Sequence, residues 1–310
     1  DSDFNVEEDV HKIYSGKEKV FEQSVVITTW QSASRLPADW FLQFGCVIGD
    51  EAHTFKAKSL TTIMERLCNA DMRIGTTGTL DGGQVNELTL KGSFGSIFKV
   101  ITTKELIESH TLADLKIQCL ALKYPDEERK AFGKKTYAEE VEFIASHEKR
   151  NRFITNLALD QPGNTLVLYN LVKKHGEPLF KQIKERAGDR PVFFVSGGVN
   201  AEERERIREL TEKATGAIIV ASMGTFAVGI NIKNLHNIIF ASPTKSQIRV
   251  LQSIGRGLRK SENDQGTVIF DLADDLSWKR RKNYTLKHAV ERVGIYNKEE
   301  FDYNIYEVKL

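Results

Sequence analysis

The chain has 310 residues, of which 40% are hydrophobic and 28% are charged, and its formal net charge is +1. This length suggests about two domains, and the hydrophobic content is sufficient for two ordinary cores. The three cysteines are scattered and odd in number, which argues against a disulfide framework or a zinc site and favours a reducing compartment.

The N-terminus is polar, and no apolar run approaches the length of a membrane span. We therefore expect a cytoplasmic protein that does not bind membranes. The near-neutral charge does not exclude a nucleic-acid partner, because acids elsewhere on the surface can balance a local basic track. The sequence contains no internal repeat and no low-complexity segment.

Three short apolar runs predict strands in the first third of the chain, at residues 24–28, 45–49 and 72–76. A helical pattern lies between the last two, at residues 59–69, and another covers residues 103–110. The pattern restarts after Leu112, so we place a domain break near residues 111–114. This gives domains at residues 1–112 and 113–310.

Six further runs predict strands in the second domain, and helical segments alternate with them. The strands are expected at residues 117–122, 165–169, 191–195, 217–221, 237–240 and 266–270, and the helices near residues 149–159, 178–187, 200–214 and 246–259. Strands separated by helices imply an α/β fold with a parallel sheet and right-handed crossovers. Residues 124–137, rich in Lys, Asp and Glu, predict a solvated insertion or a flexible connector.

An acidic pair follows the second strand, where the apolar run ends in Gly49-Asp50-Glu51-Ala52-His53. Two acids at the carboxyl end of a strand suit a nucleotide-hydrolysing site, in which one carboxylate binds magnesium and the other contacts the attacking water. We assign Asp50 as the main magnesium ligand. Glu51 lies beside the metal and is assigned to contact the attacking water. The alternative role of such a pair is to cap a helix.

Two arginines lie three residues apart in the segment Gln252-Ser253-Ile254-Gly255-Arg256-Gly257-Leu258-Arg259. On a helix this spacing places Arg256 and Arg259 on one face, where both can reach the same anion. Guanidinium groups bind phosphate oxygens at two points and stabilise the charge that develops as a phosphoryl group leaves. The predicted target is the γ-phosphate of a nucleotide.

With these segments in view, the chain resembles the superfamily 2 helicases, and in particular the UvsW-type DNA helicases of phages. The resemblance runs nearly end to end. The matching segments are residues 28–32 (motif Ib), 50–53 (motif II), 77–79 (motif III), 165–170 (motif IV), 222–231 (motif V) and 252–259 (motif VI). Residues 229–236 and 287–292 point to the UvsW type.

The resemblance implies two RecA-like, doubly wound parallel-sheet domains, the first incomplete at its N-terminus, and a helical tail at the C-terminus. It implies ATP and Mg²⁺ as cofactors, held between the two domains, and Glu51, Arg256 and Arg259 as catalytic residues. The expected cofactor-binding residues are Asp50, His53, Gly229, Asn231, Gln252, Arg256 and Arg259. Thr77, Gly78 and Thr79 are expected to couple the sites.

The resemblance also implies nucleic-acid contacts that track the backbone without reading sequence. These would come from Thr29, Gln31 and Ser32 in the first domain and from Asn170, Ser196, Gly197 and Ser222 in the second. For each lone Thr or Ser the alternative is a turn or cap residue. Lys279, Arg280, Arg281 and Lys282 form the densest basic cluster, beside an aromatic residue that could stack on a base; the alternative is solvated surface.

One family feature is missing from this sequence. Superfamily 2 enzymes hold the nucleotide phosphates with a Gly-rich loop that ends in Gly-Lys-Ser or Gly-Lys-Thr, and no such loop precedes residue 28. Gly133-Lys134-Lys135-Thr136 lacks the earlier glycine and follows no strand, so we interpret it as a solvated basic loop. We expect the chain to be part of a longer protein, and the alternative is a natural loss of the loop.

The expected function is that of an ATP-dependent DNA helicase on branched DNA, including junctions, displacement loops, RNA–DNA hybrids and stalled forks, in recombination, repair and replication. We expect a monomer, located in the host cytoplasm if the chain comes from a phage. The alternatives are an RNA helicase, a restriction-type translocase, or a nucleic-acid-binding module without ATPase activity. Retention of Glu51 and both arginines favours an active enzyme.

Overall fold

The computed structural model describes residues 4–14, 20–78, 80, 84–132, 135–225, 232, 234–243 and 266–310. The chain forms two compact units, residues 1–98 and 99–310, and we describe each by itself. The boundary between the units precedes the expected break near residues 111–114. The reason is that Ile107 and Leu112 pack against the core of the second unit, so the helix at Thr103–Glu108 belongs with that unit.

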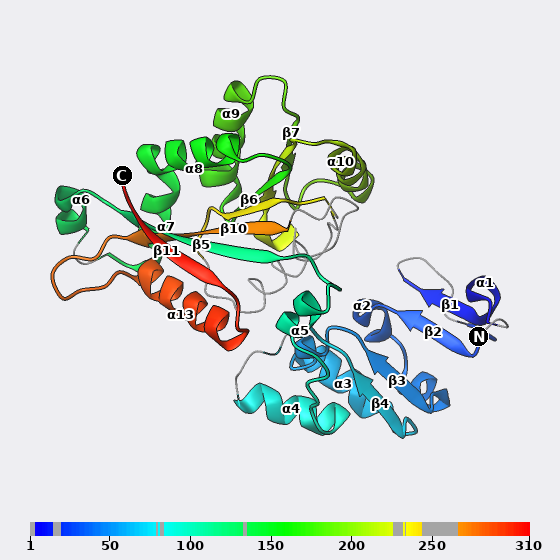
Figure 1. Ribbon diagram of the computed structural model, residues 1–310. Helices are drawn as coiled ribbons and strands as arrows, with labels where there is room; N and C mark the ends of the chain where they lie inside the picture. The colour runs from blue at the N-terminus through cyan, green and yellow to red at the C-terminus, as the bar shows by residue number, and fades with distance from the viewer. Residues whose placement is uncertain are drawn as a thin grey trace. The chain divides into compact units, whose positions relative to one another are not determined.

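The first unit contains two small parallel sheets, β1 with β2 and β3 with β4 (Figure 1). The strands are β1 (Val10–Ile13), β2 (Val25–Thr28), β3 (Cys46–Gly49) and β4 (Met72–Gly75). The helices are α1 (Val6–Asp9), α2 (Trp30–Ala33), α3 (Lys58–Arg66) and α4 (Gln84–Phe94), with 3-10 turns η1 (Ala38–Gln43) and η2 (Ala52–Thr54).

The core of the first unit lies between α3 and the segments around it. Leu60, Ile63 and Met64 project from one face of α3 into a cluster with Phe41 and Phe55. Their spacing of three and four residues is that of an amphipathic helix. This packing holds the carboxyl ends of β3 and β4 in place.

The second unit is built on a seven-stranded parallel sheet in the order β11-β5-β10-β9-β6-β8-β7, which confirms the predicted parallel α/β fold. The strands are β5 (Leu115–Lys123), β6 (Thr165–Tyr169), β7 (Val192–Val195), β8 (Ile218–Ser222), β9 (Asn237–Phe240), β10 (Thr267–Asp275) and β11 (Tyr303–Lys309). The helices are α5 (Thr103–Glu108), α6 (Asp126–Ala131), α7 (Tyr137–Ser146), α8 (Glu148–Asp160), α9 (Glu177–Arg186), α10 (Ala201–Lys213) and α13 (Tyr284–Lys298), with a π-helical turn η3 (Val172–Gly176).

Helices cover both faces of this sheet (Figure 1). Alternate residues of β6 divide between two cores, as the two-residue period of a strand requires. Leu166 and Leu168 pack in the core that includes Ile207 of α10 and Tyr296 of α13. Val167 and Tyr169 pack in the core that includes residues of α8 and α9. All five residues of β6 are buried, as expected for a central parallel strand.

Two buried ion pairs fix helices to β10. The guanidinium of Arg150 (α8) binds both carboxylate oxygens of Asp274 at 2.6 and 3.0 Å. Arg292 (α13) binds Asp271 at 2.6 to 2.9 Å, and the hydroxyl of Tyr296 also donates to Asp271. Because a buried charge is tolerated only with a partner and hydrogen bonds, these pairs hold α8 and α13 in place.

The segment 124–137 differs from its expected form. It contains helix α6, and the residues on either side of this helix, Tyr124 and Phe132, are buried in the second unit. The carboxylate of Asp274 accepts a hydrogen bond from the hydroxyl of Tyr124 at 2.9 Å. The high charge of the segment reflects an exposed helix face, so the prediction of a solvated insertion or flexible connector was wrong at these anchored positions.

Within the described residues, no helix combines the length and the apolar character that a membrane span requires.

Candidate functional site

The predicted acidic pair lies at the carboxyl end of β3, and both side chains are exposed. Glu51 has φ 49, in the left-handed region that non-glycine residues seldom occupy. Backbone strain of this kind costs about 1–3 kcal/mol and concentrates at functional sites. Gly49 allows the end of β3 to pack against two aromatic rings, because a Cβ on this residue would lie only 2.8 Å from Phe55 and Phe94.

Asp50 is oriented from both sides. Its Oδ1 accepts from the backbone N–H of Glu51 at 2.9 Å and from the hydroxyl of Thr76 at 3.3 Å. Thr76 directly follows β4, whose register with β3 places the two strand ends together. Thr76 is a site residue that the sequence motifs do not predict, although the rule that parallel strands end at one edge of a sheet points to it.

His53 connects the acidic pair to the segment after β4. It is buried, and its Nδ1 lies 2.9 Å from the hydroxyl of Thr77 and 3.2 Å from the carboxylate of Glu51. The structure therefore brings together Glu51 and His53 of one predicted motif and Thr77 of another. Gly78 follows in the same segment and is exposed.

The residues of this cluster fit a magnesium site in which the bound nucleotide supplies some of the metal ligands. Mg²⁺ in nucleotide sites is held by one or two carboxylates together with waters and phosphate oxygens. Asp50 and Glu51 supply two exposed carboxylates. The described residues contain no group of three or more His, Cys, Asp or Glu that could hold a metal.

The predicted nucleic-acid residues of the second unit follow different strands of one parallel sheet. Because all seven strands point the same way, their carboxyl ends form a single edge of the sheet, which we call the carboxyl edge. Asn170 follows β6, Ser196 and Gly197 follow β7, Ser222 ends β8, and the basic cluster follows β10. The loops that carry these predicted residues therefore all lie at the carboxyl edge of the sheet.

Hydrogen bonds shape each of these loops. The backbone N–H of Asn170 donates to the hydroxyl of Ser242 at 3.0 Å, and its side chain donates to the carbonyl of Pro243 at 3.2 Å. Ser196 closes a turn with Val199. The Ser222 hydroxyl accepts from the backbone N–H of Thr225 at 3.3 Å, which is the cap role considered as an alternative.

The basic cluster forms a compact turn. Trp278 and Arg281 exchange two backbone hydrogen bonds of 3.0 and 3.1 Å, and Lys279 has φ 53. The Arg129 guanidinium lies 5.8 Å from the centre of the Trp278 ring, and Arg281 donates to the carbonyl of Phe132 at 3.0 Å.

Three of its four cations are exposed, namely Lys279, Arg280 and Lys282, whereas Arg281 is half-buried. Arg281 thus supports the turn, and the other three are the residues that can meet a phosphate backbone. We refer to residues 278–282 as the basic turn.

In the first unit, Thr29 caps helix α2. Its side chain accepts from the backbone N–H of Ser32 at 3.4 Å and donates to the Ser32 hydroxyl at 3.1 Å. Gln31 is exposed on the same short helix. These three residues lie just after the carboxyl end of β2, so the cap and an exposed polar surface occur together there.

Several predicted residues lie outside the described parts of the chain. They are Thr79, Gly229, Asn231, Gln252, Arg256 and Arg259. The dismissed loop candidate at residues 133–136 is described at its end, where Thr136 and Glu139 form a reciprocal capping box at the start of α7. The hydroxyl of Thr136 therefore has a structural partner.

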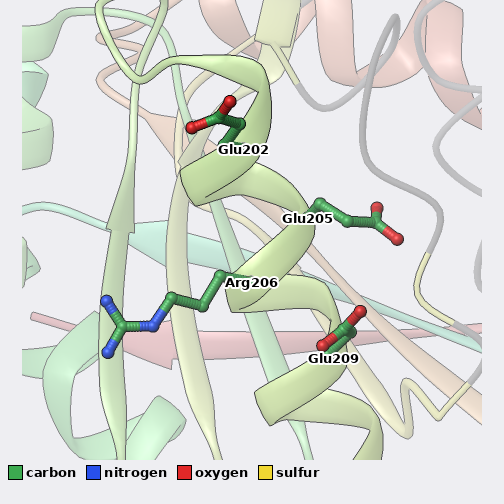
Figure 2. A pocket seen from close by; sticks show the side chains of 4 residues that line it. All are labelled: Glu202, Glu205, Arg206 and Glu209. Carbon is green, nitrogen blue, oxygen red and sulfur yellow. The ribbon is translucent and has the colours of Figure 1, made fainter.

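A shallow hollow lies on α10 between Glu202, Glu205, Arg206 and Glu209. Figure 2 shows Glu205 and Arg206 pointing to opposite sides of the helix. Glu205 pairs with Arg208 on the same helix. These side chains do not converge on a ligand, and we interpret them as a solvated helix face.

Two family models match the chain. The helicase conserved C-terminal domain matches residues 148–261, and the model of the type III restriction enzyme res subunit matches residues 2–82. Among curated proteins, the ATP-dependent DNA helicase uvsW of Enterobacteria phage T4 is 38% identical over 92% of this chain. The chain spans 59% of the length of that relative.

Solved structures give the same result for the fold. The crystal structure of T4 UvsW has a TM-score of 0.56 at 35% identity and covers 98% of this chain and 62% of its own. A fragment of a putative HsdR subunit of a type I restriction enzyme from Vibrio vulnificus has a TM-score of 0.69 at 18% identity and covers 97% of this chain and 55% of its own. At this lower identity the second likeness concerns the fold alone.

Proposed function

Because the chain belongs to the superfamily 2 helicases, with their RecA-like α/β fold, we propose that it provides the catalytic acids, the arginines and the nucleic-acid track of an ATP-dependent DNA helicase. The observation that carries the proposal is the placement of the predicted residues at strand ends. Asp50, Glu51 and His53 follow one strand, and the polar and basic loops of the second unit share its carboxyl edge.

Glu51 is the proposed base that orients and deprotonates the attacking water. Its carboxylate lies 3.2 Å from His53, which links it to Thr77. Asp50, held by Thr76 and the N–H of Glu51, would bind Mg²⁺ together with the nucleotide phosphates. The bound metal would neutralise charge on the phosphates. Arg256 and Arg259 are proposed to contact the γ-phosphate and to stabilise the charge that develops during transfer.

The carboxyl edge supports binding to the nucleic-acid backbone. Its loops offer hydroxyls, amides and backbone N–H groups, and the basic turn adds three exposed cations. Such groups position a strand without reading base edges. We therefore propose binding that is independent of sequence, with contributions from Thr29, Gln31 and Ser32 in the first unit. Branched DNA is the proposed substrate, and RNA–DNA hybrids are included.

The proposal is tested with fluorescence titrations of the chain against linear and branched DNA of several unrelated sequences. We expect affinities that are equal across sequences within about threefold and that are higher for branched DNA. Strong preference for one sequence would refute backbone tracking. Equal affinity for linear and branched DNA would refute the substrate proposal, and a preference for single-stranded RNA would favour the RNA helicase alternative.

A further inference from the structure

Two exposed aromatic residues lie at the carboxyl ends of β1 and β2 in the first unit. Tyr14 directly follows β1 and is 48% exposed, and Trp30 begins α2 two residues after β2 ends and is 46% exposed. The two strands are parallel, with Ile13 opposite Thr28, so both aromatic residues lie at the same edge of this small sheet. Because tryptophan is highly buried on average, a tryptophan with this exposure is a candidate contact residue.

The backbone of α2 is anchored, although the indole ring of Trp30 lies at the surface. Ala33 and Leu36, which follow in the same segment, are buried in the core of the first unit. The backbone N–H of Ser34 donates to the carbonyl of Trp30 at 2.9 Å, and Thr29 caps the helix. The position of Trp30 is therefore fixed by its own helix, without burial of its ring in the core.

Trp40 shows the contrasting role of a core tryptophan in the same unit. The centres of the Phe41 and Phe44 rings lie 5.1 and 4.7 Å from that of Trp40, which packs against the core. Aromatic rings gain stability both from the area they bury and from such ring contacts. The exposed surface of Trp30 can gain the same kind of contact from a ligand that has a flat aromatic face.

Polar groups flank Trp30 along the chain. Thr29 precedes it, Gln31 follows it and is exposed, and Arg35 is exposed in the turn after α2. Proteins that bind single strands combine aromatic rings, on which bases stack, with cationic and polar groups that contact the backbone. The same combination occurs here in one short segment, beside residues already proposed to contact the nucleic-acid backbone.

We propose that Trp30 is a base-stacking residue that binds the face of an unpaired nucleobase in a single DNA strand. In a duplex the bases stack on one another, whereas an unpaired strand leaves their faces accessible. Stacking does not read sequence, because every base has a π-face. The inference rests on the proposed function and extends it, because it names an unpaired base as a ligand of the first unit.

The test compares Trp30→Ala with the unaltered chain in fluorescence anisotropy titrations. The probes are two labelled single strands of equal length, an oligothymidine and a fully abasic strand that keeps the phosphates. Trp30→Ala should weaken binding to the oligothymidine by about fivefold or more, and binding to the abasic strand by less than about twofold. Trp30→Phe retains an aromatic ring and should recover at least half of the lost affinity on a logarithmic scale.

The matched control is Tyr306→Ala, which removes an aromatic side chain of similar exposure from the middle of β11 in the second unit. It should leave the affinity for both strands within about twofold of the parent value. If circular dichroism shows that Trp30→Ala unfolds the first unit, Trp30→Leu takes its place. Leucine keeps a large apolar side chain without a ring, so stacking predicts a loss with Leu and retention with Phe.

The possible failures are distinguishable. Failure of the unaltered chain to bind DNA would refute the proposed function. Normal binding of the oligothymidine by Trp30→Ala would overturn the stacking role and leave the proposed function intact. Equal losses on the oligothymidine and the abasic strand would also overturn it, because Trp30 would then act through the fold or the backbone contacts. An equal loss on blunt duplex DNA would contradict the assignment of an unpaired base.

Discussion

Replacement of the three exposed cations of the basic turn should reduce the salt dependence of DNA binding. In the variant Lys279→Ala/Arg280→Ala/Lys282→Ala, Arg281 is kept because it donates to the carbonyl of Phe132 and supports the fold. Each phosphate contact contributes about 0.7 to the slope of log affinity against log salt for single strands, and about 0.9 for duplex DNA. Three lost contacts should lower the slope by about 2 to 3.

This difference is large enough to measure. Between 50 and 200 mM salt, a slope change of about 2 corresponds to a change of roughly tenfold or more in the relative affinities of variant and parent. The assay is fluorescence anisotropy at four or more salt concentrations, with linear and branched DNA of unrelated sequence.

The matched control replaces three exposed cations near the opposite, amino edge of the sheet, Lys116, Arg186 and Lys213. It removes the same charge but should leave the slope within about 0.5 of the parent value. An unchanged slope in the basic-turn variant would show that the turn is ordinary surface. Equal slope losses in both variants would show a general charge effect.

Three further predictions concern catalysis and stability. In a protein that includes a phosphate-binding loop, Arg259→Ala should lower kcat about a hundredfold or more with a smaller effect on nucleotide affinity, as steady-state kinetics would show; a raised KM at normal kcat would contradict the assignment. Asp271→Asn leaves the buried Arg292 without its anion and should destabilise the protein by about 3–5 kcal/mol in urea unfolding, whereas Glu300→Gln, which breaks the exposed pair with Lys104, should have no measurable effect. Finally, burial lowers the pKa of His175 to about 3, which means that the unfolded chain binds an extra proton below about pH 6.5, so stability should fall by about 2 kcal/mol from pH 7 to pH 5. His175→Gln should remove that loss and leave only the smaller contribution of His236, because burial lowers the pKa of His236 as well. An unchanged dependence of the free energy of unfolding on pH in this variant would contradict the prediction.

The strands with fully buried apolar runs could be predicted from the sequence to the residue. β6 and β9 have the expected bounds, because every position in them is buried. β10 continues to Asp275, beyond the expected end at Phe270, since Asp271 and Asp274 are paired with buried arginines and remain in the strand. Hydrophobicity alone cannot show that a carboxylate will find such a partner.

The missed elements have weaker patterns. β11 is an edge strand, and most of its residues are exposed, so it lacks the apolar run of a central strand. α7 begins within a charged segment, where the reciprocal bonds of Thr136 and Glu139 form the cap. The helix expected at residues 246–259 lies outside the described residues.

The site shows the same limit. The acidic pair after a strand predicted Asp50 and Glu51, and the family resemblance added His53 and Thr77; the structure brings these four residues into contact. Thr76 was missed because it lies 26 positions from Asp50 in the sequence and meets it only through the pairing of β3 with β4. A threonine reveals such a partner only once the strands are paired.

The most direct test of the proposed ATP-dependent motor is the rate of ATP hydrolysis, with and without DNA, for the chain alone and for the chain extended upstream by a segment carrying a Gly-Lys-Ser or Gly-Lys-Thr loop. We predict little or no turnover by the chain alone and DNA-stimulated turnover by the extended protein. In the latter, Glu51→Gln should lower turnover by about a hundredfold or more while ATP binding is retained. Substantial hydrolysis by the 310-residue chain alone, or normal turnover in Glu51→Gln, would contradict the account.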